Sequence, residues 1–227
     1  MKTRSHSAFT LIEMLVVISI IAVLAAFAVP ALTSALTKGQ MTGTLNNGRQ
    51  LYLAGQQMAL DGAANSDPSL VWPGDDLTNI VTVTDYMNRL YQNDYLKPGD
   101  LQKLLNGPGT NATVTANAGT PPTVTLGGTI PAFKIFRVKD ADSANVVFLE
   151  TNNYTYNTTL QGVTTAPFGD KGFIVQRRGG DASILRKNNA LAGGNGAVFQ
   201  GTVGKRTGDP DGNPSAGDGA GLLLTWP

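Results

Sequence analysis

The chain has 227 residues, with 17 basic and 16 acidic side chains and a formal net charge of +1 at pH 7. We see no basic stripe with interleaved aromatic residues, so we expect no nucleic-acid partner. The absence of cysteine excludes disulfides, thiolate catalysis and cysteine-held metal sites. The single histidine is His6, near the N-terminus, so the commonest general base is missing from the body of the chain. Glu150 and Asp170 are catalytic candidates that no motif supports, and we predict that the chain is not an enzyme.

The N-terminal segment joins a short basic head to a long apolar run. Lys2 and Arg4 occur in the head without an acidic residue, which predicts a cytoplasmic location for the head. From Phe9 to Pro30 the only charged residue is Glu13. A helix over this run would be about 33 Å long at ~1.5 Å per residue, which matches the hydrocarbon core of a bilayer. We therefore predict one membrane span.

Glu13 separates three interpretations of this segment. A carboxylate in an apolar environment costs several kcal/mol unless it is paired, so its presence predicts a functional partner. A secretory signal peptide cut after Ala26-Phe27-Ala28 would not need this acid, and neither would a plain membrane anchor. The third interpretation depends on the residues around Glu13.

The stretch Ala8-Phe9-Thr10-Leu11-Ile12-Glu13, between basic residues and a long apolar run, resembles the N-terminus of type IV pilins and type II secretion pseudopilins. The resemblance implies that residues 1–8 are a leader, which a prepilin peptidase removes between Ala8 and Phe9 before the new amine of Phe9 is methylated. Ala8 departs from the family pattern, which usually has Gly there, but it keeps a small residue. The resemblance also implies that Glu13 pairs with the Phe9 amine of a neighbouring subunit.

This resemblance implies a structural role and a set of partners. Before assembly, the subunits would reside in the inner membrane as single-pass proteins with a periplasmic globular domain. They would then form a homopolymer through their N-terminal helices, in a periplasmic or surface filament. An assembly platform, its ATPase and other pseudopilins would assist. The lack of cysteine favours a type II secretion pseudopilus subunit, because many pilins hold their C-terminal region with a disulfide. A type IV pilus or competence subunit, and a secreted binding module, are the alternatives.

The helix is expected to continue beyond the membrane span. Residues 9–30 form the spanning and polymerisation segment, and Pro30 predicts a kink because it removes one backbone donor. Residues 31–62 form an amphipathic continuation that ends near Asp61-Gly62, although a helix end at Pro30 is an alternative. The apolar positions of this continuation are Leu32, Leu36, Met41, Leu45, Tyr52 and Ala59.

Residues 63–227 are predicted to form a globular domain that begins with a loop and a helical insert. The loop over residues 63–76 should fold Val71 and Trp72 back onto the body. The insert, at about residues 84–106, has a first helix capped by Thr84 or Asp85 and ended by Lys97-Pro98-Gly99, and a short second helix. Its tyrosines are expected to pack in the core. Residues 110–129 are rich in Thr, Ala, Asn and Gly and read as a loop or a loose hairpin.

A small antiparallel sheet is expected over residues 131–187. Strand candidates rich in β-branched and aromatic residues occupy residues 132–139, 145–150, 172–176 and 183–186, and Gly179-Gly180-Asp181 is a turn between the last two. Three to five strands would cover the C-terminal half of the long helix, which gives each layer an apolar face to bury. The predicted fold class is therefore α+β, with a long kinked N-terminal helix, a small antiparallel sheet and long loops.

The C-terminal loop region contains the one candidate ligand site. Calcium takes six to eight oxygen ligands, and oxygen-bearing side chains are closely spaced there. The match to an EF-hand is poor, because the glycine comes early and no Glu closes the loop. Major pseudopilins resemble this chain in having a calcium-binding C-terminal loop, so a calcium site and an ordinary solvated loop both stay open, and we expect no other cofactor. The candidate ligands are Asp209, Asp211, Asn213 and Asp218.

Overall fold

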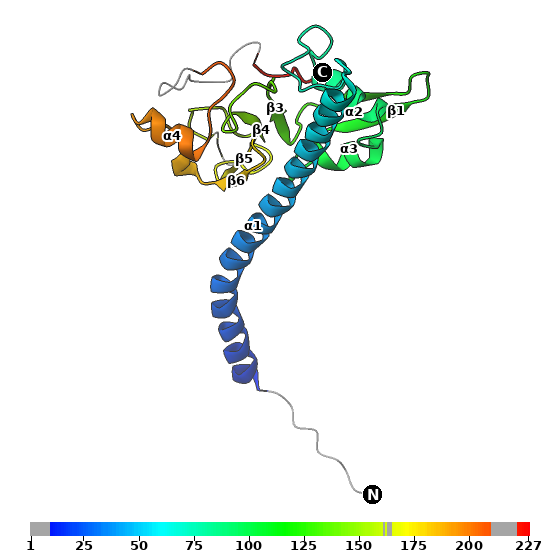
Figure 1. The fold of residues 1–227 in the computed structure, drawn as a ribbon. Coiled ribbons are helices and arrows are strands. Elements are labelled where there is room, and N and C mark those ends of the chain that lie inside the picture. The colour runs from blue at the N-terminus through cyan, green and yellow to red at the C-terminus, as the bar shows by residue number, and fades with distance from the viewer. Residues whose placement is uncertain (1–9, 161, 163–164, 210–221) are drawn as a thin grey trace, which may run out of the picture. The chain divides into compact units, whose positions relative to one another are not determined.

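The computed structural model describes residues 10–160, 162, 165–209 and 222–227. By its contacts the chain forms two compact units, Met1–Gly39 and Gln40–Pro227. One helix, α1 (Leu11–Asn65), supplies residues to both units (Figure 1). It passes through Pro30 and ends at Asn65, so the predicted continuation is confirmed and a helix end at Pro30 is wrong.

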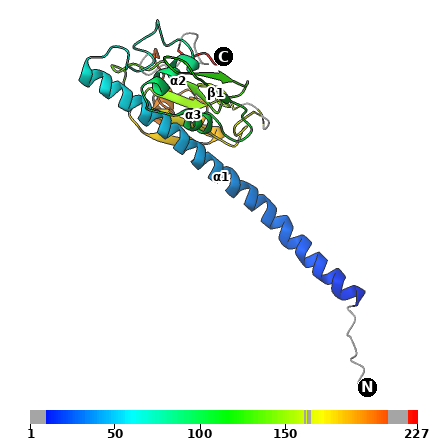
Figure 2. The ribbon, with the colours of Figure 1, turned by 90° about the vertical axis from the view of Figure 1, so that its right-hand side faces the viewer.

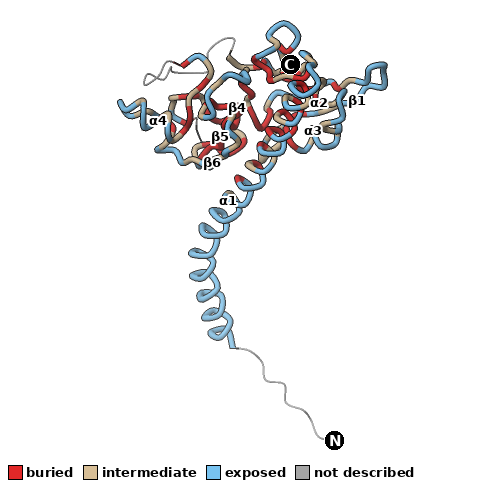
Figure 3. The backbone as a smooth tube through the Cα atoms, viewed as in Figure 1, coloured by how far each residue is buried: buried red, intermediate tan, exposed pale blue. Residues whose placement is uncertain are grey.

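In the first unit, the described side chains from Thr10 to Leu36 are exposed (Figure 3). This part of α1 is mostly apolar, and several of its few hydroxyl groups bond within the helix. Ser19 Oγ donates to the Val16 carbonyl at 2.7 Å, and Thr33 Oγ1 donates to the Pro30 carbonyl at 2.9 Å. Such internal bonds suit a helix surrounded by lipid or by other apolar helices, where water cannot accept them.

In the second unit, the rest of α1 buries one face against the body. The residues on this face are Met41, Thr44, Gly48, Leu51, Tyr52, Ala54, Gly55, Met58 and Gly62. Of the apolar positions expected from the sequence, Met41 and Tyr52 are buried, Leu45 and Ala59 are half-buried, and Leu32 and Leu36 are exposed. Leu32 and Leu36 belong to the first unit, where every described side chain up to Leu36 is exposed.

Two glycines on the buried face of α1 allow close contacts. A Cβ atom on Gly55 would lie 2.1 Å from the Tyr86 hydroxyl, and one on Gly62 would lie 2.0 Å from the Leu70 carbonyl oxygen. Glycine weakens a helix by about 1 kcal/mol relative to alanine. At these two positions the lower helix propensity is offset by the close packing that the missing side chain allows.

Helices α2 (Val83–Gln92) and α3 (Pro98–Leu104) form the helical insert, and Figure 2 shows them beside the C-terminal part of α1. The predicted caps were wrong by a few residues. Thr82 is the N-cap of α2, and its hydroxyl oxygen accepts a hydrogen bond from the Asp85 backbone N–H. The Asp85 carboxylate in turn accepts a hydrogen bond from the Thr82 backbone N–H, which completes a capping box. Pro98 begins α3 and does not end α2, because proline at a first helical position loses no needed donor.

The threonine-rich tract forms a hairpin. Strands β1 (Thr113–Asn117) and β2 (Thr123–Gly127) pair antiparallel as a separate two-stranded sheet. Side-chain bonds tie it to the helical insert, because Asn88 exchanges bonds with both backbone groups of Val124, at 2.6 and 3.1 Å. Of the two predicted alternatives, loop and hairpin, the structure has the hairpin.

The main sheet has four antiparallel strands in the order β3-β4-β5-β6. Their bounds are Phe133–Ile135, Val147–Thr151, Phe173–Arg177 and Ala182–Leu185, which confirms the four predicted strands, although β3 is shorter. All residues of β4 and β5 are buried, so both faces of these strands are covered.

The C-terminal region is more regular than the predicted loop. It contains a 3₁₀ turn, η1 (Lys187–Asn189), and helix α4 (Gly196–Thr202). The last residues pair with segments that are distant in sequence, because Leu224 N donates to the Ile135 carbonyl at 2.9 Å and Val83 N donates to the Thr225 carbonyl at 2.9 Å. The C-terminal segment therefore lies between β3 and the start of α2 and forms backbone hydrogen bonds with both.

An aromatic cluster lies at the centre of the second unit. The ring centroid of Trp72 is 5.8 Å from that of Tyr52 and 5.3 Å from that of Phe148, and Tyr86 lies 6.4 Å from Phe148. Trp72 folds back as predicted, and the buried Tyr86 confirms that tyrosines of the insert pack in the core. The architecture is the predicted α+β fold, a long helix with small antiparallel sheets.

Candidate functional site

Glu13 lies in the first turn of α1, where Thr10 caps the helix. The Thr10 backbone N–H and the Thr10 hydroxyl both donate to Glu13 Oε2 at 2.8 Å, and Glu13 N–H donates to Thr10 Oγ1 at 3.3 Å. This reciprocal pattern is a capping box. Sequence reasoning missed the role of Thr10, although Thr10 and Glu13 have the S/T-x-x-E spacing that predicts one.

The capping box leaves the charge of Glu13 without a cation among the described residues. Both hydrogen bonds that these residues make to the carboxylate come from Thr10 and reach Oε2. An acid in the first helical turn gains about 0.3–1 kcal/mol from the helix dipole, which is less than the several kcal/mol of burying a carboxylate. Ala8 and Phe9, the predicted cleavage and pairing residues, lie outside the described residues.

The side chains that follow Glu13 form a large exposed apolar surface. Leu11 is 83% exposed and Phe27 is 77% exposed, and aliphatic residues fill the helix between them. By length and composition α1 could cross a membrane. Soluble proteins seldom expose apolar patches beyond a few hundred Å² unless they contact a membrane or another protein. This segment therefore needs an apolar environment that the monomer does not provide.

Pro30 lies within this exposed segment, and its position fits the predicted local weakening of the helix. Proline has no N–H to donate to the carbonyl four residues earlier, that of Ala26. Whether the helix bends there stays a prediction.

The structure places one of the four calcium candidates in an ion pair. Asp209 and Arg206 are buried, with Arg206 Nη2 and Asp209 Oδ1 3.7 Å apart, and Arg206 N–H donates to Asp209 Oδ2 at 3.2 Å. The Arg206 guanidinium also lies over the Tyr156 ring, 4.5 Å from its centroid. Asp211, Asn213 and Asp218 lie outside the described residues. A calcium ion that used Asp209 would compete with Arg206 for the carboxylate, so the calcium site stays a prediction.

The two unsupported catalytic candidates lie in different surroundings. Glu150 is fully buried on β4. Asp170 is near the surface, where Lys187 Nζ donates to Oδ2 at 3.1 Å, and this hydrogen bond lowers the pKa of the Asp170 carboxyl. In the described part of the chain, no three acidic or histidine side chains gather in a way that could hold a metal ion.

Comparisons with known proteins point to the N-terminal segment. Residues 3–29 match the family model described as the prokaryotic N-terminal methylation motif. The chain is 33% identical to the fimbrial protein EcpC of Eikenella corrodens over a matched region of 116 residues. This region covers 51% of this chain and 65% of EcpC, which is just under two thirds of that relative's length. No solved structure matches the chain. The chain is therefore similar, in its N-terminal methylation motif and over about half of its length, to proteins of the fimbrial kind.

Proposed function

We propose that this protein is a pilin-type structural subunit that polymerises through its N-terminal helices after a prepilin peptidase removes residues 1–8. One observation carries the proposal. The described residues from Thr10 to Leu36 form a helix that is exposed and mostly apolar, and its one acid, Glu13, has only Thr10 as a hydrogen-bonding partner among the described residues. A bundle of such helices would bury the apolar surface and would require a cation for Glu13.

Cleavage between Ala8 and Phe9 would create that cation. A new α-amino group has an ordinary pKa of about 7.7–8.0, so much of it is protonated near neutral pH. Within one helix the first-turn carboxylate already bonds to Thr10, and the amine of a neighbouring copy would add the missing positive charge. Because an unpaired buried charge is costly, only helices in the matching register would pack stably. Assembly would then select one stagger between neighbouring subunits.

Before assembly, the same apolar helix would hold the subunit in the inner membrane. Lys2 and Arg4 favour a cytoplasmic leader, and the globular domain would then lie on the periplasmic side. An assembly platform and its ATPase would extract the subunit into the filament. These partners are inferred from the proposed filament function alone, because no contact in the structure points to them.

Two kinds of filament are supported by different observations. The relative named as a fimbrial protein supports a subunit of a type IV pilus. The absence of cysteine supports a type II secretion pseudopilus, because many pilins hold the C-terminal region with a disulfide. Deleting the gene separates the two: loss of surface filaments indicates a pilus, and loss of protein secretion without loss of surface filaments indicates a pseudopilus.

Substitution of Glu13 tests the proposal. Glu13→Gln removes the charge but keeps an oxygen that accepts from Thr10, so cleavage and helix capping should persist while filament yield falls at least about tenfold, the change expected when ~1.4 kcal/mol of pairing is lost. Thr10→Val is the matched control, because it removes the capping hydroxyl and keeps the charge. It should retain filaments. Yields are counted by electron microscopy, and processing is checked by intact mass.

Abundant filaments from Glu13→Gln would refute the pairing. An equal loss from Thr10→Val and Glu13→Gln, with both chains processed, would show that Glu13 acts through the helix cap and not through a neighbouring amine.

A further inference from the structure

The C-terminal segment, residues 222–227, adds a strand-like piece of chain to the edge of the main sheet. Leu224 N–H donates to the Ile135 carbonyl at 2.9 Å, and the Leu222 carbonyl accepts from the Arg137 N–H at 2.8 Å. On its other side β3 pairs with β4. The segment therefore covers the edge of β3 with the backbone pairing that extended peptides use when they bind to a sheet.

The residues before α2 form a second wall around this segment. Thr225 N–H donates to the Val81 carbonyl at 3.4 Å, and the Thr225 carbonyl accepts from the Val83 N–H at 2.9 Å. We call the space between β3 and residues 81–83 the β3 groove. Because most of these bonds use backbone groups, the β3 groove recognises an extended piece of chain from both sides.

The side chains of the segment supply the apolar part of the contact. Leu224 is buried in the main hydrophobic core, and Leu222, Leu223 and Trp226 pack against that core. Trp226 Nε1 also donates to the Gly128 carbonyl at 2.8 Å. Without an occupant, the β3 groove would expose both apolar core surface and an unpaired strand edge, and such edges readily pair with other chains.

The connection to this segment is longer than docking within one chain requires. Leu222 lies beside Gly208, because a Cβ atom on Gly208 would be 3.5 Å from Leu222 Cδ2. Points this close can be joined by about two to five residues. Residues 210–221, which lie outside the described residues, separate Asp209 from Leu222 in the sequence.

The length of this connection is enough to reach another copy. From Asp209 to Leu222 the chain can extend to roughly 45 Å. A compact unit of the size of Gln40–Pro227 has a radius of gyration of about 16 Å. Residues 210–221 include no aromatic or branched aliphatic residue, so they bring no large apolar side chain that needs burial. The segment could therefore extend from one unit to the groove of a neighbour in contact with it.

We propose that the β3 groove accepts residues 222–227 of a second copy, so that neighbouring subunits exchange their C-terminal segments. An exchanged segment would make the same hydrogen bonds and bury the same side chains as it does within one chain. Exchange of an identical element is a low-cost route to association. The inference rests on the proposed filament function, because a filament holds the copies close together and gives each groove a high effective concentration of neighbouring segments.

Cysteine cross-linking tests the exchange, since the chain has no native cysteine. Val81 and Thr225 are both exposed, and one hydrogen bond joins their backbones. Full-length chains with Val81→Cys are co-expressed with differently tagged full-length chains with Thr225→Cys, and the assembled filaments are treated with a short bismaleimide. A covalent dimer that carries both tags should form, because exchange brings cysteines of different chains together.

Leu224→Asp, added to the Thr225→Cys chain, is the matched control. It keeps the cysteine but places a carboxylate at a buried position, so this segment should no longer enter a groove. The yield of the two-tag dimer should fall at least about fivefold in filaments that contain both chains. An unchanged yield would overturn the inference, because the cysteines would then meet without docking of the segment.

A shorter connection separates exchange from docking within one chain. Deleting residues 212–219 leaves a connection of at most roughly 17 Å, which suffices for the chain's own groove but is about one radius of gyration. Full-length chains with both Val81→Cys and Thr225→Cys should give covalent multimers in filaments. The same chains with the deletion should close internally and run as monomers, and their melting temperature should stay within about 2 °C of that of the full-length chains.

The outcomes separate this inference from the proposed function. Normal filaments in which the full-length double variant closes internally, without multimers, would overturn the exchange and leave the proposed function standing. Equal multimer yields with and without the deletion would also overturn it. If the cysteine-free parent forms no filaments, the proposed function fails and the inference fails with it.

Discussion

At the scale of single residues, Gly55 shows how a position that weakens a helix can stabilise a fold. The Tyr86 hydroxyl occupies the space where a side chain would begin, and the Tyr86 ring is completely buried. The same helix contains Gly43, where a Cβ atom would meet nothing within 4 Å. Substitution by alanine should therefore destabilise the fold at Gly55 and stabilise it at Gly43.

Gly55→Ala should lower the free energy of unfolding by about 1–3 kcal/mol through overpacking. Gly43→Ala should raise it by about 0.5–1 kcal/mol through helix propensity. Adding Tyr86→Phe to Gly55→Ala should recover most of the loss, because the hydroxyl is the atom in conflict and the next contact is at 3.4 Å. Urea unfolding of the full chain in detergent micelles measures all four proteins. A double variant no more stable than Gly55→Ala would contradict this packing.

Tyr95 gives a prediction about pH. Burial, together with the hydrogen bond it donates to Asp61 Oδ2 at 2.7 Å, raises the pKa of Tyr95 to about 12. An unfolded tyrosine has a pKa of about 10, so the folded state holds this proton more tightly. The stability from this group is present below pH 10 and is lost as the pH rises from about 10 to 12.

Tyr95→Phe should cost about 0.5–1.5 kcal/mol at neutral pH, the usual net value of one hydrogen bond. It should also reduce the loss of stability between pH 10 and 12. Thermal unfolding of both proteins across this range provides the comparison, and parallel curves with a constant offset would show that Tyr95 does not hold its proton as described.

At the scale of elements, much of the fold could be predicted from local patterns. The four strands of the main sheet and the turn at Gly179-Gly180-Asp181 follow from β-branched runs and turn residues, and α1 follows from its length and periodicity. The N-cap of α2 was misplaced because Thr82, Thr84 and Asp85 are all capping residues, and only the Thr82 to Asp85 spacing forms the reciprocal pair.

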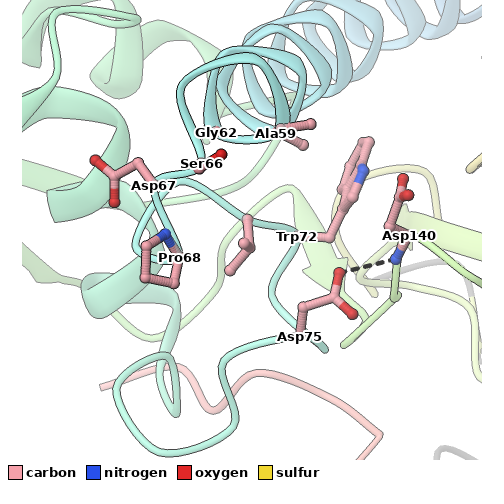
Figure 4. A pocket seen from close by; sticks show the side chains of 10 residues that line it. Ala59, Gly62, Ser66, Asp67, Pro68, Trp72, Asp75 and Asp140 are labelled. Atoms are coloured by element: carbon pink, nitrogen blue, oxygen red, sulfur yellow. Dashed lines mark hydrogen bonds between the residues drawn. The ribbon is translucent and has the colours of Figure 1, made fainter.

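Other elements depend on contacts between distant parts of the chain. The segment that ends the chain has no clear periodicity, and its partners are Ile135, Arg137 and Val83, far away in sequence. For the same reason the two hollows lined by Trp72, one of which Figure 4 shows, could not be predicted, because they bring residues 59–75 beside Asp140 and Arg178. At the N-terminus the opposite holds, since Glu13 was singled out from six consecutive residues, although the capping role of Thr10 within them was missed.

The buried pair of Arg206 and Asp209 makes a prediction for the C-terminal element. Removing one partner of a buried ion pair can cost about 3–5 kcal/mol, so Asp209→Asn should destabilise the protein with or without calcium. Asp211→Asn should have little effect without calcium, and if the loop binds calcium it should remove any calcium-induced rise in the melting temperature. Thermal unfolding in millimolar calcium and in a chelator measures both. A calcium-induced rise that Asp209→Asn alone abolishes would show that this carboxylate leaves Arg206 to bind the ion.

At the scale of the whole molecule, the first part of α1 needs partners that only other molecules supply. Its exposed apolar surface suits lipid or other apolar helices, and in the proposed assembly Glu13 would pair with a cation of a neighbouring copy. In this account cleavage of the leader links the two states, because it creates the positive charge that Glu13 requires.

The N-terminus of the mature chain tests this central claim most directly. Filaments or membranes from cells that express the full chain with a prepilin peptidase are purified, and the N-terminal peptide is identified by mass spectrometry. The account predicts a chain that begins at Phe9 with a methylated amine. A mature chain that begins at Val29 would indicate a secretory signal peptide, and that result, or an uncut chain within assembled filaments, would contradict the account.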